Sequence, residues 1–264
     1  MAGRNLRQYR GRLVTLVLGS VVSLVCVGMV GHAAAAAQSS INEGVALRTI
    51  ELKAESDRPD DQQLHADALA GMAALPGVVS VEPWAQASIG IKTADVSGAL
   101  LYATSVRASL PPPVVQGVRG NVLPLAAGEV LLPATSQGQD FRRLIGQRVP
   151  VTYTRKVAEG QGEAASDQVT VVGVYDPAFA LDGPSAAYTD NDSVLRWAAA
   201  KVGVPASDYV ATVGYREAFV VVGNSADTGR VLDRLRAEGY AANSVQETLT
   251  TLPTGMRTYG FWAS

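Results

Sequence analysis

The stretch EAFVVVGNSADTGRVLDRLRAEGYAANSVQETLT, residues 217–250, decides the fold of this chain. Residues 217–223 form a short apolar run that is typical of a buried strand. Residues 225–238 carry apolar side chains at helical spacing, and Gly239 follows where a helix C-terminus favours glycine. Residues 240–250 predict a second strand. The stretch therefore predicts a strand–helix–strand unit.

The same order of elements occurs nearer the N-terminus. Residues 47–54 (LRTIELKA) predict a strand with mixed faces. A helix is expected to begin at residues 59–61 (PDD), because helix starts favour proline and acidic side chains, and to stop at Pro76-Gly77. Residues 78–92 predict extended chain. Two such units can close into one split βαβ sheet of the ferredoxin-like type.

The sequence between the two units has a different composition. It is rich in glycine and proline, and its short apolar runs are bounded by turn residues, which is typical of strands. The predicted strands are 100–106, 129–132, 149–154, 168–175 and 210–215. The predicted helices are 140–145 and a segment that is capped by 189–193 and ends near 202. Residues 158–167 are the predicted hairpin tip. We expect an α+β fold in which a split βαβ subdomain (45–94 and 215–252) holds an inserted small β-rich subdomain (95–214).

The first 37 residues predict a membrane anchor. Residues 1–12 contain four arginines and no acidic residue, and residues 13–31 are 19 almost purely apolar residues. A helix of that length spans roughly 28 Å, which is close to the hydrocarbon thickness of a bilayer. We expect a cytoplasmic basic leader (1–12), a single transmembrane helix (13–37) and a body outside the cell membrane, because positively charged flanks stay in the cytoplasm. Residues 253–264, which hold aromatic side chains, are expected to form a membrane-proximal tail.

A cleaved signal peptide is the alternative explanation of this leader. The basic start, the apolar stretch and the alanines at 33–37 offer an A-x-A cleavage site. The apolar stretch is longer than the roughly 7–15 residues usual in secretory signals, which favours a retained anchor. Under both interpretations residues 45–264 are exported.

The composition excludes several classes of function. With 47% hydrophobic and 17% charged residues, the 264-residue chain does not have the composition of a disordered protein. Its formal net charge of -2 lacks the positive charge that is typical of nucleic-acid-binding proteins. The single cysteine, Cys26, excludes an internal disulfide, and two histidines cannot build a Cys/His metal site. Neither the phosphate-binding motif G-x-x-x-x-G-K-[ST] nor the nucleophile motif G-x-S-x-G occurs. We therefore expect no catalytic, cofactor-binding or metal-binding residues, no cofactor and no enzyme activity.

A few side chains that could carry chemistry have simpler structural explanations. His65 is expected on a solvated helix face rather than in a catalytic pair, since no nucleophile is indicated beside it. The stretch 190–192 (DND) is expected to cap a helix, because the glycine and glutamate of a calcium loop do not follow it. Trp84 is expected in the core or facing a partner, and Trp197 is expected partly in the core.

Three short motifs resemble one family by their order and spacing. AGEVLLP (127–133), FRRLIGQRV (141–149) and VTVVGVY (169–175) resemble the MacB-like periplasmic core domain of FtsX-like ABC transporter permeases. The leader at 5–12 and the segment LPGVVSVE (75–82) are also similar to that family. The resemblance implies an α/β subdomain with an inserted β subdomain. This module would stand outside the membrane and relay movement driven by a separate cytoplasmic ATPase.

The resemblance also implies partners. These are the membrane, an ABC ATPase subunit and the remaining permease helices, while pairing with a second copy as a homodimer stays open. Residues 38–264 contain no second run of about 18 apolar residues, so the further helices are expected on another chain or in a missing C-terminal part. The expected function is the extracytoplasmic core domain and first anchor of an ABC transporter permease, acting in transport or mechanotransmission without catalysis. The alternatives are a secreted or single-span anchored binding module, released after signal cleavage, and an exported hydrolase of unfamiliar type.

Overall fold

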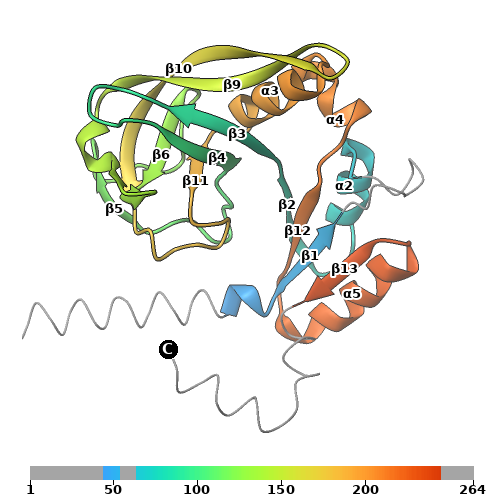
Figure 1. Ribbon diagram of the computed structural model, residues 1–264. Coiled ribbons are helices and arrows are strands. Elements are labelled where there is room, and N and C mark those ends of the chain that lie inside the picture. Colours follow the sequence, from blue (N-terminus) through green and yellow to red (C-terminus); the bar gives the residue numbers. More distant parts are fainter. Residues whose placement is uncertain (1–43, 54–63, 245–264) are drawn as a thin grey trace, which may run out of the picture. The chain divides into compact units, whose positions relative to one another are not determined.

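The structure is a computed structural model that describes residues 44–53 and 64–244 (Figure 1). The predicted leader (1–12), transmembrane helix (13–37) and tail (253–264) lie outside these ranges. Within the described ranges, no helix combines the length and the apolar character that crossing a membrane requires. The described residues from Leu47 onward form one compact unit.

Four strands and two helices form the first part of the compact unit (Figure 1). The strands are β1 (Thr49–Lys53), β2 (Val78–Trp84), β12 (Glu217–Val222) and β13 (Ala241–Ser244), and the helices are α2 (Ala66–Ala73) and α5 (Thr228–Ala237). The strand order is β13-β1-β12-β2, and all neighbouring strands are antiparallel. This is the order of a split βαβ sheet. The prediction that the two strand–helix–strand units share one sheet is confirmed.

One face of this four-stranded sheet belongs to the main core. Side chains alternate along a strand, so Ile50 and Leu52 of β1 point to the same face as Val220 of β12. All three are buried in one cluster with Met72 of α2 and Leu232 of α5. Burying this face against the apolar stripes of the helices supplies most of its stabilisation.

The other face of the sheet carries polar and aromatic side chains. Glu51, Phe219 and Glu82 are register partners and form one row across β1, β12 and β2. Glu217 and Trp84 are paired in the next row of the same face. This face therefore presents groups that can make specific contacts with the inserted part of the chain.

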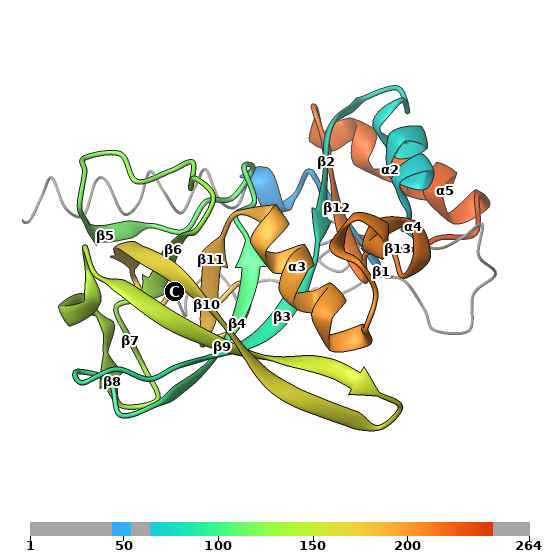
Figure 2. The same cartoon turned by 90° about the horizontal axis from the view of Figure 1, so that it is seen from above.

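The inserted part is a cylinder of six strands (Figure 2). In spatial order the strands are β3 (Gln86–Ile91), β4 (Ala99–Ser105), β11 (Ala186–Thr189), β6 (Glu129–Pro133), β10 (Gln161–Tyr175) and β9 (Arg148–Ala158). The cylinder closes because β9 pairs with β10 on one side and with β3 on the other. A further strand, β5 (Val114–Gly117), pairs with the end of β10, and β7 (Thr135–Ser136) and β8 (Gln139–Asp140) form a short hairpin. The predicted α+β class with a β-rich insertion matches this arrangement.

Helix α3 (Asn191–Val202) packs against β9, β3 and β4 of the cylinder. Its predicted start is confirmed, because the Asp190 carboxylate accepts a hydrogen bond from the Ser193 backbone N–H at 2.9 Å. Trp197 is buried in the core and its Nε1 donates to Asp167 Oδ2 of β10 at 2.7 Å. The short helical segments elsewhere are η2 (Phe141–Leu144), η3 (Ala206–Asp208), α4 (Tyr209–Thr212) and η4 (Ser225–Asp227).

The structure corrects three local predictions. The strand predicted at 210–215 is wrong, because α4 occupies its first half and Gly214, at φ +73°, ends the helical turn. The hairpin tip predicted at 158–167 is wrong in length, since the turn is only Glu159-Gly160 and the rest pairs with β9. Strand β3 lies in the stretch assigned to the first subdomain, yet it bonds to β4 and β9 of the cylinder. The chain changes sheets at Ala85.

Candidate functional site

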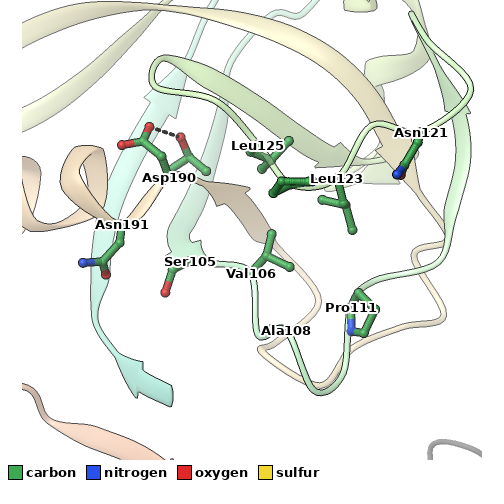
Figure 3. Close-up of a pocket in the computed structure, with 11 residues that line it drawn as sticks. Ser105, Val106, Ala108, Pro111, Asn121, Leu123, Leu125, Asp190 and Asn191 are labelled. Atoms are coloured by element: carbon green, nitrogen blue, oxygen red, sulfur yellow. Dashed lines mark hydrogen bonds between the residues drawn. The ribbon is translucent and has the colours of Figure 1, made fainter. Parts of the chain in front are cut away.

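A pocket of about 620 Å³ lies at one end of the cylinder strands β4 and β11 (Figure 3). Its lining combines the end of β4 and the following segment, the loop after β5, and the start of α3. The residues are Ser105, Val106, Ala108, Pro111, Asn121, Leu123, Pro124, Leu125, Thr189, Asp190 and Asn191. This is a volume that suits a small organic ligand, for which pockets of about 300–1,000 Å³ are usual.

The apolar wall of the pocket rests on a second core cluster. Leu131 of β6 is buried there with Tyr175 and Tyr188, on the opposite side of the sheet from Val130 and Leu132. The pocket residues Val106, Leu123 and Leu125 are partly buried and pack against this cluster. The wall therefore has a well-packed base and an apolar surface that remains open to the pocket.

The polar end of the pocket lies where α3 begins. Burial alone would raise the pKa of Asp190, but hydrogen bonds from Ser193, Gly128 and Thr189 together lower it. Asp190 is the one charged side chain among the pocket residues. Asn191 Nδ2 donates to the Tyr215 hydroxyl at 3.4 Å, whereas its buried Oδ1 accepts no hydrogen bond from the described residues. The pocket thus has an apolar wall and a polar end whose Asp190 carboxylate is already hydrogen-bonded within the protein.

A bidentate ion pair between Arg119 and Glu129 holds the loop that forms the outer wall of the pocket. The Arg119 guanidinium donates to both oxygens of Glu129, at 2.7 and 2.8 Å, and to the backbone carbonyls of Asn121 and Val122. The hydrogen bonds from Arg119, followed by one from the Ala126 backbone, lower the pKa of Glu129 to about 2. The loop from residue 119 to residue 129 is therefore tied to the first residue of β6.

The three sequence motifs that carry the family resemblance form one contiguous substructure. Strand β6, from the first motif, pairs in parallel with β10, from the third. The second motif lies beside them, because Gly146 N–H donates to the Val171 carbonyl at 2.7 Å and Val171 N–H donates to the Gln147 carbonyl at 3.0 Å. Gly146 has a φ of +81°, a conformation that side chains with a Cβ rarely adopt.

A second polar site joins the cylinder to the four-stranded sheet. Arg107 follows β4 and is 7% exposed; its Nη2 donates to Asp182 Oδ1 at 2.7 Å. Asp182 Oδ2 accepts a hydrogen bond from the Tyr188 hydroxyl, also at 2.7 Å. The Arg107 guanidinium carbon lies 4.2 Å from the centre of the Phe219 ring on β12, which is a cation–π distance. The ion pair of the cylinder is therefore stacked on the other sheet.

Ser109 makes a second contact between the same two parts. Its backbone N–H and its hydroxyl donate to the two carboxylate oxygens of Glu82 on β2, at 2.9 and 2.6 Å. A cavity of about 290 Å³ lies beside these contacts and is lined in part by Glu51, Trp84 and Glu217. Burial raises the pKa of Glu217, and Lys53 opposes that effect. We refer to the contacts of Arg107 and Ser109 with Phe219 and Glu82 as the junction.

The structure places the other candidates from the sequence apart from one another. His65 stands before the first residue of α2 and is half-buried, with Nδ1 2.7 Å from the Val210 carbonyl, so the expected solvated face is wrong. Trp84 lines the junction cavity, and its buried Nε1 has no hydrogen-bond partner among the described residues. Within the described ranges no group of three His, Cys, Asp or Glu side chains could hold a metal ion.

The sequence reasoning missed Arg107 and Asp182. A signal for Arg107 existed, because it is the one charged residue between Asp95 and Arg119. A lone charge in an apolar, strand-rich stretch is a candidate for a buried, paired group, since an unpaired charge is costly to bury. Its partner could not be chosen from the sequence, because 75 residues separate the two side chains.

No protein-family model matches the chain, and no curated protein matches it either. Among solved structures, the fold is similar to the extracellular domain of the noncanonic ABC-type transporter YknZ from Gram-positive bacteria. That likeness has 15% sequence identity and a TM-score of 0.43, and it covers 75% of this chain and 99% of that chain. The fold is also similar to the periplasmic region of MacB from Actinobacillus actinomycetemcomitans, with 12% identity, a TM-score of 0.42, and coverage of 80% of this chain and 96% of that chain.

Proposed function

We propose that this chain supplies the extracytoplasmic core domain and the first membrane anchor of an ABC transporter permease complex. The observation that carries the proposal is that the three family-like motifs meet in one substructure. β6 pairs with β10, and the segment from Gly146 to Gln147 bonds to the same strand. Their order along the chain, together with their contact in the folded domain, supports the proposal.

The leader supplies the membrane part of the proposal. Four arginines precede 19 almost purely apolar residues, so the N-terminus stays in the cytoplasm and the folded body stands outside. Residues 38–264 offer no second apolar run of that length, so we place the further permease helices on another chain or in a C-terminal part beyond residue 264, and the ATPase on a separate chain.

The proposed role is mechanical rather than catalytic. The domain has two sheets that contribute to one hydrophobic core cluster and are also joined by specific contacts at the junction, where Arg107 pairs with Asp182 and stacks on Phe219. Such a domain can pass a movement of the membrane anchor from one sheet to the other. ATP hydrolysis on a separate cytoplasmic chain would drive this movement.

Co-purification from native membranes tests the proposal. The full chain, tagged at its C-terminus, is solubilised in a mild detergent from the cells that normally make it, and its partners are identified by mass spectrometry. We expect an ABC ATPase subunit and permease helices in amounts comparable with the tagged chain. The control is the same chain with residues 1–37 replaced by a cleavable signal peptide, which exports the body without its anchor and is expected to recover far less of the ATPase. Isolation of the anchored chain without an ATPase would overturn the proposal.

The pocket favours a second candidate function. A volume of about 620 Å³ with an apolar wall and a polar end suits a binding module, whether anchored or released. N-terminal sequencing of the mature protein separates a released module from an anchored chain. A start near Gln38 supports a released binding module, and an intact leader contradicts release. With the leader intact, the co-purification separates an anchored binding module from the permease domain.

A further inference from the structure

We propose that residues 106–109 connect the pocket to the junction, so that an uncharged apolar ligand in the pocket holds the two sheets more firmly together. The connection is a property of the folded domain and goes beyond the proposed function. It needs neither the ATPase nor the other permease helices, so its test and the co-purification can fail independently.

The pocket itself defines the class of ligand. Leu123 and Leu125 on one segment and Val106 and Ala108 on another provide facing apolar surfaces (Figure 3). At the polar end, the Asp190 carboxylate already accepts hydrogen bonds from Gly128, Thr189 and Ser193. Its charge disfavours an anion there. The fitting ligand is therefore an uncharged apolar molecule.

Successive side chains of residues 106–109 point alternately to the pocket and to the junction. Val106 and Ala108 line the pocket, whereas Arg107 lines the junction cavity. Ser109 points the same way as Arg107, since it bonds to Glu82 of the four-stranded sheet. The segment is short and closed, because Leu110 N–H donates to the Arg107 carbonyl at 3.2 Å. A displacement on its pocket side is therefore also a displacement on its junction side.

The junction side of the segment is fixed at a single place on the other sheet. Arg107 stacks on Phe219 and Ser109 bonds to Glu82, and these two sheet residues are direct register partners on β12 and β2. Because the two contacts are made with one cross-strand pair, we expect them to form and break together. Packed interfaces of this kind have discrete arrangements instead of deforming continuously.

The open side of the segment explains how a ligand would act. Its junction side is in contact with the sheet, so the space into which the segment can withdraw is the pocket. A ligand that occupies the pocket removes that space and makes undocking less favourable. The ligand then shifts the equilibrium by as much as it prefers the docked state.

The experiment places an occupant in the pocket by covalent attachment. In a C26S background, Ala108→Cys provides a thiol at the pocket, and a methanethiosulfonate reagent adds either a methyl or a cyclohexylmethyl group as a mixed disulfide. Hydrogen exchange of the full chain in lipid nanodiscs is then followed by mass spectrometry over β2 and β12. We expect exchange there to be about fivefold slower with the cyclohexylmethyl group than with the methyl group, at the lower end of usual coupling strengths.

Two controls make the outcome decisive. Lys92→Cys carries the same groups at an exposed position that does not line the pocket, and we expect no difference between them. The variant E82Q/F219L weakens the docking contacts while keeping a side chain of similar size at each position, and we expect the difference at Ala108→Cys to disappear. If this double variant does not fold, E82Q alone replaces it, with a reduced difference expected. Equal exchange with the two groups at Ala108→Cys, or an undiminished difference in the docking variant, would overturn the proposal.

Discussion

At the scale of single residues, Glu129 shows how one side chain serves both the fold and the pocket. It is the acidic residue of the first family-like motif and the first residue of β6. Arg119 holds it in a two-pronged ion pair, and its carboxylate also accepts from the Ala126 backbone. Because the partners of Glu129 lie within the loop that forms the pocket wall, its charge fixes the shape of the wall.

This pairing predicts an acid-sensitive contribution to stability. Hydrogen bonds from Arg119 lower the pKa of Glu129 from its ordinary value of 4.5 to about 2. Because the pKa of Glu129 is lower in the folded state than in the unfolded chain, its ionisation stabilises the folded state at pH values above the unfolded pKa. That stabilisation is lost as the pH falls from about 4.5 toward 2. We expect Glu129→Gln to lower the free energy of unfolding by about 1 kcal/mol at pH 7, and to have a smaller effect at pH 3.

Urea unfolding followed by circular dichroism at both pH values measures this effect. Glu159→Gln is the matched control, because Glu159 is paired with Lys156 at the exposed turn between β9 and β10. We expect no measurable change in that variant. A loss in Glu129→Gln that is the same at pH 7 and pH 3 would show that the charge is not what matters.

At the scale of elements, the sequence pattern predicts the strands and helices better than their connections. Residues 217–223 and 225–238 correspond to β12 and α5, because local apolar periodicity specifies both. The closure of the cylinder could not be predicted, since it depends on β9 pairing with both β10 and β3. Pairing between distant strands leaves no local signal.

The same reasoning explains which parts of the sites were predictable. The cap at Asp190 follows from its position before an apolar helical pattern, and the structure confirms it. The strand predicted at 210–215 failed because η3 and α4 form successive helical turns there and Gly214 ends them. The stacking of Arg107 on Phe219 joins residues of two different sheets, and no periodicity within either segment indicates it.

Replacing glycine by alanine is expected to have opposite effects on stability at two positions, Gly173 and Gly71. A Cβ on Gly173 would lie 2.6 Å from the Gln116 carbonyl oxygen and 3.1 Å from Gly117 Cα, so Gly173→Ala must push β5 away from β10. We expect this change to lower the free energy of unfolding by about 1–3 kcal/mol, as overpacking usually does. Gly71 in α2 has no atom within 4 Å of the same position, so Gly71→Ala is expected to stabilise by about 0.5–1 kcal/mol.

Thermal unfolding and hydrogen exchange of the two variants measure these effects. In Gly173→Ala, faster exchange is expected over β5 and the adjoining end of β10, and little change over the four-stranded sheet. Unchanged exchange at β5 would contradict the proposed close approach of the two strands.

At the scale of the whole molecule, the two sheets share one hydrophobic core cluster, and the junction adds specific polar contacts between them. Arg107 and Asp182 are both buried in the cylinder, and their pair is stacked on Phe219 of the other sheet. Burying a paired charge is only weakly stabilising, but burying an unpaired one is strongly unfavourable. The pair therefore acts mainly to fix one arrangement of the two sheets.

A double-mutant cycle tests this role of the pair. We expect Arg107→Met to lower the free energy of unfolding by about 3–5 kcal/mol, because Asp182 is left buried without its cation. Adding Asp182→Asn, which keeps an acceptor for the Tyr188 hydroxyl, is expected to restore a large part of that loss. Urea unfolding of the unsubstituted chain, the two single variants and the double variant supplies the four values. A double variant no more stable than Arg107→Met alone would rule out the ion pair as the source of the loss.

The central claim is that the folded body stands outside the membrane, held by the leader. The most direct measurement is labelling of intact cells with a membrane-impermeant maleimide, in a C26S background with one added cysteine. We expect Glu159→Cys, at the exposed turn between β9 and β10, to be labelled on intact cells, and Gly3→Cys in the leader to be labelled only after the cells are permeabilised. Protection of Glu159→Cys on intact cells, or labelling of Gly3→Cys without permeabilisation, would contradict the claim.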